Sequence, residues 1–219
     1  MLKKNKVTLI ITSVILLLPM VVGLLLWNQL PEQVPFHWNA AGEVDGWSSR
    51  AVAVFVMPLI MLVIQWFCVI VTSLDPKHKN VAGKPMTLVL WICPVMNILI
   101  NTMMYAAALG YDLSIEIIMP LAMGAMFIVI GNYMPKCKRN YTIGVKVPWA
   151  LEDEANWNAT HRFAGWVWVA GGVVIMLTSL LGNAWVSMGA ILPMAIAPIV
   201  YSYVYYRNHG KGEAHEDDQ

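Results

Sequence analysis

The fold is decided by residues 7–27, which read VTLIITSVILLLPMVVGLLLW and contain no Asp, Glu, Lys or Arg. A helix needs about 20 mostly apolar residues to cross the roughly 30 Å hydrocarbon core of a bilayer. Two further charge-free runs are long enough, Ala51–Leu74 and Pro85–Tyr111. Each of these three runs therefore predicts one membrane-spanning helix.

The second half of the chain predicts three more spans. Ile117–Met134 lies near the lower length limit, and apolar residues before it can extend the helix. Phe163–Tyr206 is free of charge over about twice a span, and Gly182-Asn183 suits the turn between two helices. Hydrophobic residues make up 58% of the chain and charged residues 12%, against roughly 45–50% and 25% in soluble domains. The sequence therefore predicts an all-α integral membrane protein with six transmembrane helices.

Positive charge predicts how these helices are oriented. Cytoplasmic loops carry an excess of Lys and Arg. All of the 14 Lys and Arg residues except Arg50 lie on one side of the membrane if the six spans alternate. We therefore expect a multi-pass protein of the cell membrane with both termini in the cytoplasm. The net charge of +1 provides no basic field for nucleic acid.

These spans divide the chain into two predicted halves. Residues 1–112 hold three helices and an ordered extracellular loop at residues 28–50, here called the first motif. Residues 113–206 hold three helices and an ordered cytoplasmic loop at residues 131–162, here called the second motif. Residues 207–219 end in a run of acidic side chains and are expected to form a disordered cytoplasmic tail.

Few polar side chains lie inside the predicted spans. None of them is Asp, Glu, His, Lys or Arg, which argues against a proton- or ion-coupled transporter. Asn97 and Asn101 lie one helical turn apart and are expected to hydrogen-bond between helices rather than to line a path. Cys68, Cys93 and Cys137 have no metal-ligand spacing and predict no structural disulfide. We expect neither a metal ion nor a cofactor.

The first motif is too regular to be a simple linker. Its prolines hold the chain extended, its glycines permit turns, and its two Trp side chains suit the headgroup layer. Ordered loops are common sites of binding. His37, Glu43 and Asp45 could hold a metal ion, but hydrogen bonds that shape the loop are the favoured interpretation. The predicted ligand-binding residues are Pro35, His37, Trp38, Asn39, Gly42, Asp45 and Trp47.

The second motif combines helix breakers with basic and aromatic side chains. Pro135 is expected to end the fourth span, and residues 152–154 suit the first turn of a short helix. On that helix Asp153, Trp157 and His161 would share one face. Anchoring to anionic headgroups explains any single Lys here, whereas the whole set equally favours a surface for a protein partner. The predicted partner-binding residues are Asn132, Pro135, Lys136, Arg139, Asn140, Gly144, Lys146, Pro148, Trp149, Trp157, Thr160, His161 and Arg162.

Both motifs carry a resemblance to the SdpI family, the membrane immunity proteins against the sporulation-delaying-protein toxin. The residues of the second motif that resemble the family's cytoplasmic signature are Gly131, Asn132, Met134, Pro135, Lys136, Asn140, Gly144, Lys146, Pro148, Trp149, Trp157, Thr160, His161 and Arg162. The residues of the first motif that resemble the family's N-terminal domain of unknown function are Pro35, His37, Asn39, Gly42 and Asp45. One departure is Ala150, where the family pattern has Thr.

The resemblance implies a function as well as a fold. It implies six spans and protection of a bacterial cell from a secreted antimicrobial peptide toxin. For the best-understood system of the family, it also implies capture of a cytoplasmic repressor protein at the membrane. We therefore expect a receptor and immunity protein that is not an enzyme, with the first motif facing the toxin and the second facing the cytoplasmic partner.

Two other functions stay open at this point. The first is an interfacial enzyme that uses His161 with Glu154 or Asp153, or a metal ion at His37 and Asp45. Against it, the sequence contains no HExxH, GxSxG, CxxC or P-loop pattern. The second is an uncoupled exporter or channel, in which the two Asn side chains of the third span would line a water-filled path.

Overall fold

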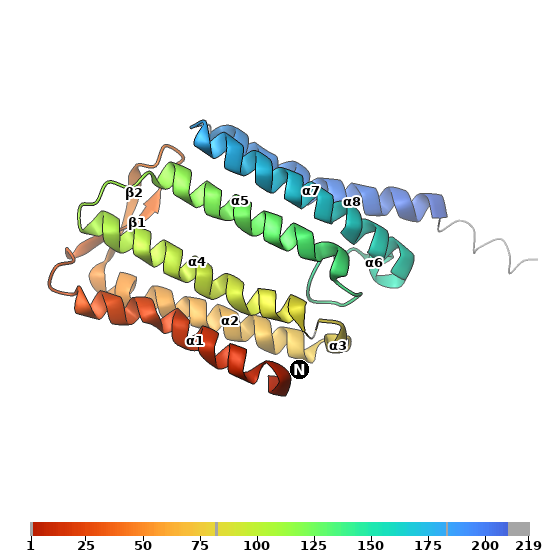
Figure 1. Cartoon of the computed structure of the whole chain (residues 1–219), viewed down its shortest axis with the longest axis horizontal. Coiled ribbons are helices and arrows are strands. Elements are labelled where there is room, and N and C mark those ends of the chain that lie inside the picture. The colour runs from red at the N-terminus through yellow and green to blue at the C-terminus, as the bar shows by residue number, and fades with distance from the viewer. Residues whose placement is uncertain (1, 82, 183, 210–219) are drawn as a thin grey trace, which may run out of the picture. The chain divides into compact units, whose positions relative to one another are not determined.

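The computed structural model describes residues 2–81, 83–182 and 184–209 and is mainly helical (Figure 1). Its helices are α1 Leu2–Leu25, the π-helical turn η1 Val52–Val56, α2 Met57–Leu74, α3 His78–Val81, α4 Lys84–Ala108, α5 Ile115–Tyr133, the 3-10 turn η2 Met134–Lys136, α6 Pro148–Glu152, α7 Glu154–Leu180 and α8 Ala184–His209. Two short strands, β1 Gln33–Trp38 and β2 Val44–Ser49, form an antiparallel hairpin.

The six predicted spans are confirmed. Six helices of the described chain are long and apolar enough to cross a membrane: α1, η1 with α2, α4, α5 with η2, α7 and α8. Gly182 lies in the turn after α7 with a φ of +70°, as its place in the sequence predicts, while Asn183 lies outside the described residues. The β-hairpin was not predicted as strands, although its extended segments and turn were.

The second motif contains less loop than its sequence suggests. α7 begins at Glu154 because the Asp153 carboxylate caps it, accepting from the N–H groups of Ala155 at 2.8 Å and Asn156 at 3.1 Å. The expected short helix is therefore the first turns of a long span. At the other end, α8 continues through Arg207 to His209, so these residues of the predicted tail are helical. Residues 210–219 of that tail lie outside the described residues.

The chain divides into two compact units. One lies within Met1–Leu74 and Met86–Met119, and the other within Asp75–Pro85 and Pro120–Gln219. The first unit therefore contains α1, the hairpin, α2 and most of α4. The second contains α3, most of α5, and α6 to α8, and each unit is described by itself below.

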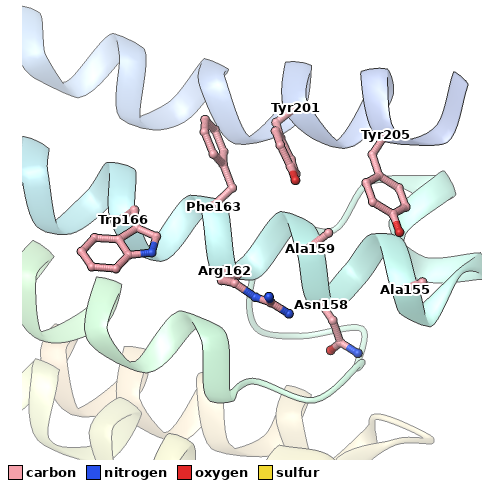
Figure 2. A pocket seen from close by; sticks show the side chains of 8 residues that line it. All are labelled: Ala155, Asn158, Ala159, Arg162, Phe163, Trp166, Tyr201 and Tyr205. Atoms are coloured by element: carbon pink, nitrogen blue, oxygen red, sulfur yellow. The ribbon is translucent and has the colours of Figure 1, made fainter. Parts of the chain in front are cut away.

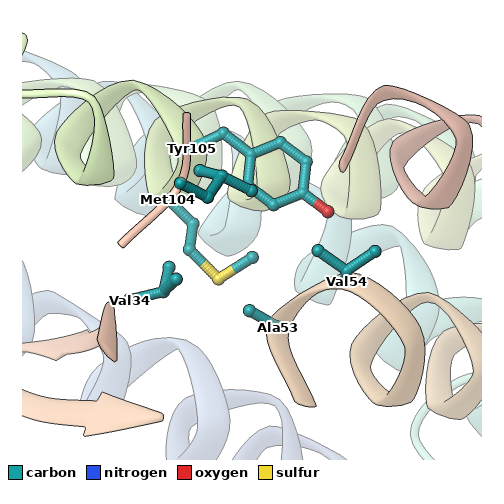
Figure 3. Packing of buried hydrophobic residues seen from close by; sticks show 6 residues of the cluster. Val34, Ala53, Val54, Met104 and Tyr105 are labelled. Atoms are coloured by element: carbon teal, nitrogen blue, oxygen red, sulfur yellow. The ribbon is translucent and has the colours of Figure 1, made fainter. Parts of the chain in front are cut away.

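The core of the first unit ties the hairpin to the helices. Val34 of β1 is fully buried and packs with Ala53 and Val54 of η1 and with Met104 and Tyr105 of α4 (Figure 3). Burying a side chain such as Val34 stabilises the unit by about 1.5–3 kcal/mol. The base of the hairpin is consequently held against the ends of the spans.

Polar side chains join the helices of this unit. Asn97 donates to the Leu16 carbonyl oxygen at 2.9 Å, and Asn101 donates to the Asn97 side-chain oxygen at 2.9 Å. The Tyr105 hydroxyl donates to the Pro19 carbonyl oxygen at 3.0 Å. Hydrogen bonding between helices is therefore confirmed for Asn97, whereas the bond from Asn101 lies within α4.

In the second unit, glycines let α5 and α7 approach closely. A Cβ atom on Gly131 would lie 2.9 Å from the Gly165 carbonyl oxygen, and one on Gly124 would lie 2.7 Å from the Gly172 carbonyl oxygen. Small residues at such positions allow spans to pack backbone against backbone. These contacts hold the second half of α5 against the middle of α7 and so bring the two ends of the connecting loop close together.

A buried polar cluster joins α7 to α8. Asn156 donates to the Ser202 carbonyl oxygen at 3.1 Å, and the Ser202 hydroxyl donates back to the Asn156 side-chain oxygen at 2.8 Å. The Thr160 hydroxyl donates to the same oxygen at 2.9 Å. All three side chains are fully buried, so the cluster fixes the pairing of the last two spans.

Candidate functional site

The first motif forms the β-hairpin, which has an irregular register. Gln33 pairs with Ser49 and Trp38 with Val44, and the pairing shifts between Pro35 and Trp38. The bulged strand turns more strongly than a regular one. Arg50 anchors the end of the hairpin, since it donates to the Trp27 carbonyl oxygen at 2.5 Å and lies 4.9 Å above the Trp27 ring.

The turn between the strands is built around one side chain. The Asn39 side-chain oxygen accepts from the N–H groups of Ala41 at 2.9 Å and Glu43 at 3.1 Å. Its amide nitrogen donates to the Glu43 carboxylate at 3.0 Å. Gly42 follows with a φ of +81°, a conformation that favours glycine. Asn39 and Gly42 therefore shape the turn.

The most exposed polar contact of the hairpin is a His–Asp pair. His37 Nδ1 lies 2.5 Å from Asp45 Oδ1, and the two side chains are 69% and 45% exposed. Gly46 makes room for the pair, because a Cβ atom there would lie 2.8 Å from the His37 Cβ. Glu43 is bonded to Asn39 instead, so the three side chains considered for a metal do not converge. The described residues contain no group of three His, Cys, Asp or Glu side chains that could hold a metal ion.

The predicted residues of the first motif thus separate by exposure. His37, Asp45 and Trp47 are exposed, the last by 59% of its surface. Pro35 is buried against the body of the unit, opposite Trp47 in the strand register. Trp38, Asn39 and Gly42 are half-buried and belong to the turn and its support. The pair and Trp47 form the accessible face of the hairpin.

In the second motif, Asn140 folds the loop onto itself. Its side-chain oxygen accepts from the N–H groups of Thr142 at 2.9 Å and Ile143 at 2.7 Å. Its amide nitrogen donates to the carbonyl oxygens of Lys138 at 2.9 Å and Ile143 at 3.1 Å. Asn140 is 1% exposed, so these bonds satisfy a buried amide and leave it no free group for a partner.

Asp75 holds the same loop from outside the motif. Its carboxylate is 4% exposed and accepts from the Tyr141 N–H at 2.8 Å, the Thr142 hydroxyl at 3.1 Å and the Lys77 N–H at 2.7 Å. Asn80 of α3 adds a bond to the Arg139 carbonyl oxygen at 2.7 Å. Sequence reasoning missed Asp75, although an acidic residue directly after a span and before Pro76 was a signal for a cap.

Trp157 and His161 form the buried centre of the second motif. Their rings stack at 3.9 Å, and the Trp157 indole donates to the Cys137 carbonyl oxygen at 2.8 Å. His161 Nδ1 lies 2.8 Å from the Trp157 carbonyl oxygen, and its Nε2 accepts from the Val145 N–H at 3.1 Å. These partners select a neutral ring with the proton on Nδ1. Both ring nitrogens are therefore occupied, which leaves His161 no free nitrogen for acid–base chemistry.

Gly144 lies directly against this histidine. Its φ is +111°, and a Cβ atom on it would lie 2.1 Å from His161 Nε2. The expected common face of Asp153, Trp157 and His161 does not form, since Asp153 turns back to cap α7. Burial also raises the pKa of the Cys137 thiol, whose side chain lies in this part of the loop.

The basic side chains of the second motif divide into two kinds. Arg139 donates to the carbonyl oxygens of Leu151 at 3.2 Å and Glu152 at 2.8 Å and so closes the end of α6. Lys136, Lys138 and Lys146 are exposed. Lys138 was not among the residues predicted for a partner. The three lysines give the loop an exposed positive surface on a rigid base.

The remaining predicted residues lie around this base. Trp149 packs its ring 5.4 Å from that of Tyr203 and 6.3 Å from that of Tyr206. Thr160 belongs to the buried cluster between α7 and α8. The predicted residues of the second motif that are exposed, apart from the lysines, are Asn132, Pro135, Pro148 and Arg162.

Each of the two motifs overlaps a match to a known protein family. Residues 14–62 match the family described as Domain of unknown function (DUF1648), and residues 136–202 match the SdpI/YfhL protein family. The Immunity protein SdpI of Bacillus subtilis (strain 168) is 29% identical over 213 residues, which cover 94% of this chain and 97% of that protein. No solved structure matches the chain. The first match contains the β-hairpin, and the second contains the loop that Asn140 and Asp75 hold.

Proposed function

Since residues 136–202 match the SdpI/YfhL protein family, as the motifs predicted, we propose that this chain is a membrane immunity protein of that family. It protects the cell that carries it against a secreted antimicrobial peptide toxin, which the β-hairpin recognises. The relative that matches along nearly the whole chain is named an immunity protein, which supports this function over an enzymatic one. The occupied nitrogens of His161 support the same choice.

The observation that carries the proposal is the exposed His37–Asp45 pair on an anchored hairpin. Both members of this pair are exposed, so both can contact a ligand. It lies on a support that is rigid at its base, through Val34 in the core and Arg50 on Trp27. Preorganised polar groups beside an exposed aromatic such as Trp47 are typical of surfaces that recognise peptides.

The orientation belongs to the proposal as well. The excess of Lys and Arg on one side supports an orientation with both termini and the second motif in the cytoplasm. The hairpin then faces outside, where a secreted peptide arrives. The third and fifth connections are short, so the hairpin is the outer segment that offers the largest contact surface.

The test is survival under toxin challenge in a sensitive bacterial cell that expresses the chain at matched membrane abundance. His37→Ala and Asp45→Asn should each reduce protection, because each changes an exposed polar group that the toxin would contact, and such a hydrogen bond is worth about 0.5–1.5 kcal/mol and more if charged. Glu32→Gln is the matched control, since it removes a charge from an exposed side chain before the same hairpin and should leave protection intact. Full protection after both changes would rule out the hairpin as the recognition element.

The two tryptophans refine the same test. Trp47 is 59% exposed and Trp38 is half-buried beside the core of the unit. Their aromatic surface suits the headgroup layer, so Phe should preserve protection better than Ala at both positions. Equal loss with Phe and Ala would assign their role to the indole N–H instead.

A second role concerns the cytoplasmic side. The exposed lysines 136, 138 and 146 stand on a loop that buried hydrogen bonds hold in one conformation. A rigid positive surface suits an acidic patch on a soluble protein. We propose that this surface recruits a cytoplasmic partner, for which a transcriptional repressor is the expected class.

A further inference from the structure

A cavity of about 610 Å³ opens between α7 and α8 at the end of the spans that carries the second motif. Figure 2 shows Asn158 and Arg162 projecting from the same side of α7, with Tyr201 and Tyr205 turned toward α7 from α8. Trp166 completes the wall and is 74% exposed. The proposed immunity function does not use this cavity.

The polar groups of the cavity are hydrogen-bond donors without partners in the described part of the chain. Arg162 makes neither an ion pair nor a hydrogen bond there, and its guanidinium is always charged. The Asn158 amide and the hydroxyls of Tyr201 and Tyr205 are likewise unbonded among the described residues. None of the described residues that line the cavity is Asp or Glu. Such a donor set fits a phosphate group.

A second groove continues from this cavity along α8. It is almost entirely apolar, has a volume of about 610 Å³ and shares Phe163 and Tyr201 with the first. Those two rings stack at 4.4 Å and form the boundary between the polar cavity and the apolar groove. From Val204 the groove extends along α8 to Leu192, about 18 Å at 1.5 Å per residue. One leaflet of hydrocarbon is about 15 Å thick, half of the roughly 30 Å core.

We propose that the cavity and the groove together bind one anionic phospholipid. Its phosphate lies at Arg162, Asn158 and Tyr205, and one acyl chain lies along α8 over the groove. The site matches such a lipid in charge and in length, because a positive, donor-rich cavity at the membrane surface leads into an apolar groove about one leaflet long.

A zwitterionic lipid fits this site less well. Aromatic rings can bind a quaternary ammonium group, but the Arg162 charge in the same cavity repels it. Glu154 is exposed and lies on the same face of α7 as Asn158, two turns from Arg162. That separation is about 12 Å along the helix, which exceeds the screening length of about 8 Å at physiological salt. The site therefore keeps its preference for negative charge, and Arg162 binds lipid rather than the cytoplasmic partner.

The experiment measures which lipid the purified full-length chain retains. The chain is exchanged from detergent into an equimolar mixture of phosphatidylglycerol and phosphatidylcholine with identical acyl chains, and retained lipid is counted by native mass spectrometry. We expect one phosphatidylglycerol retained per chain over phosphatidylcholine. Arg162→Gln should reduce this preference about tenfold, as loss of a charged hydrogen bond requires. Lys138→Gln is the matched control, because it removes an exposed charge from the same unit outside the cavity.

A second variant tests the groove without changing charge. Ala197 is half-buried in the groove wall, so Ala197→Phe should fill it and reduce retention of both lipids while leaving their ratio unchanged. Equal retention of the two lipids by the unmodified chain would overturn the proposal. So would an unchanged ratio in Arg162→Gln, or no retained lipid at all, which is the outcome expected if a peptide rather than a lipid occupies the groove. Survival under toxin challenge is measured separately, so failure of this site does not affect the immunity proposal.

Discussion

The β-hairpin and the loop of the second motif are both held in place by the side-chain hydrogen bonds of one Asn and by a glycine with positive φ. In the hairpin, Asn39 is half-buried and Gly42 touches the end of the Glu116 side chain. In the second motif, Asn140 is 1% exposed and Gly144 touches the buried ring of His161. The same pair of residue types thus supports the proposed recognition surface in one place and a buried scaffold in the other.

This difference separates the residues proposed to recognise a ligand from the residues that support the structure. Where the Asn is half-buried, at Asn39, its neighbours His37 and Asp45 are exposed and are available to a ligand. Where the Asn is buried, at Asn140, the charged side chains of residues 136–147 that stay exposed are the three lysines. Motif membership alone therefore does not assign a role to a residue, whereas burial and hydrogen bonding do.

The largest effect should come from Gly144, and Gly42 provides the comparison. Gly144→Ala should lower the free energy of unfolding by about 3 kcal/mol or more, because the new Cβ atom would lie 2.1 Å from His161 Nε2 and the ring is stacked on Trp157. Gly42→Ala should cost about 1–2 kcal/mol, the strain of a positive φ, because the Glu116 carboxylate 2.4 Å from its Cβ can turn away.

Heating each variant in detergent and measuring the monodisperse fraction by size-exclusion chromatography checks this order. Both positions have a positive φ, at +111° and +81°, so the strain of the backbone largely cancels in the comparison. Equal losses for the two variants would show that His161 is not fixed in place.

A smaller effect should follow from changing one carboxylate to an amide in each region. Asp75→Asn places N–H groups against the donors of Tyr141 and Thr142 and should cost about 1–3 kcal/mol. Asp45→Asn changes an exposed side chain and should alter stability by less than about 0.5 kcal/mol. The same thermal assay compares them, and a cost for Asp45→Asn as large as that for Asp75→Asn would contradict the division into surface and scaffold.

The spans were predicted well from the sequence because a membrane-spanning helix has a simple requirement. A helix that crosses the bilayer must be long and apolar, and that property is visible residue by residue, so all six spans are where they were expected. The start of α7 was predicted nine residues late because Glu154 and Arg162 are charged. Those charges lie in the first turns of the helix, where side chains can extend to the membrane surface. The charge-free rule therefore underestimates helices that project beyond the core.

The candidate sites were predicted in composition but not in role. Asn140, Trp157, Thr160 and His161 were expected to contact a partner, whereas all four are buried and bonded within the protein. Burial of a polar side chain depends on contacts distant in sequence, such as the one from Asp75 to Thr142, and no local pattern reveals it. The turn of the hairpin was predicted more accurately, because its contacts are local, with Asn39 and Glu43 four residues apart.

Changing the exposed lysines should affect stability even less and should affect partner binding clearly. Changing Lys136, Lys138 and Lys146 together to Gln should release a recruited cytoplasmic protein while leaving folding intact, since exposed charges contribute attraction rather than packing. Arg139 is kept, because its bonds to the end of α6 make it part of the scaffold. Proteins that co-sediment with membranes from cells with each variant are compared at low and high salt. Unchanged recovery of the partner would remove the lysine surface as the docking site.

The smallest effect is expected at Cys137, and it decides how the orientation must be tested. The side chain is 8% exposed, and burial raises the pKa of its thiol, so the reactive thiolate is scarce at neutral pH. Cys137 should therefore stay unlabelled by a thiol reagent on either side of the membrane, so the absence of labelling there does not report topology. Cysteines placed at exposed positions do report it. With an impermeant maleimide, Ala41→Cys in the hairpin should be labelled in intact cells, and Lys138→Cys only after permeabilisation. Labelling of Lys138→Cys in intact cells would invert the orientation and place the lysine surface, rather than the His37–Asp45 pair, in contact with the toxin.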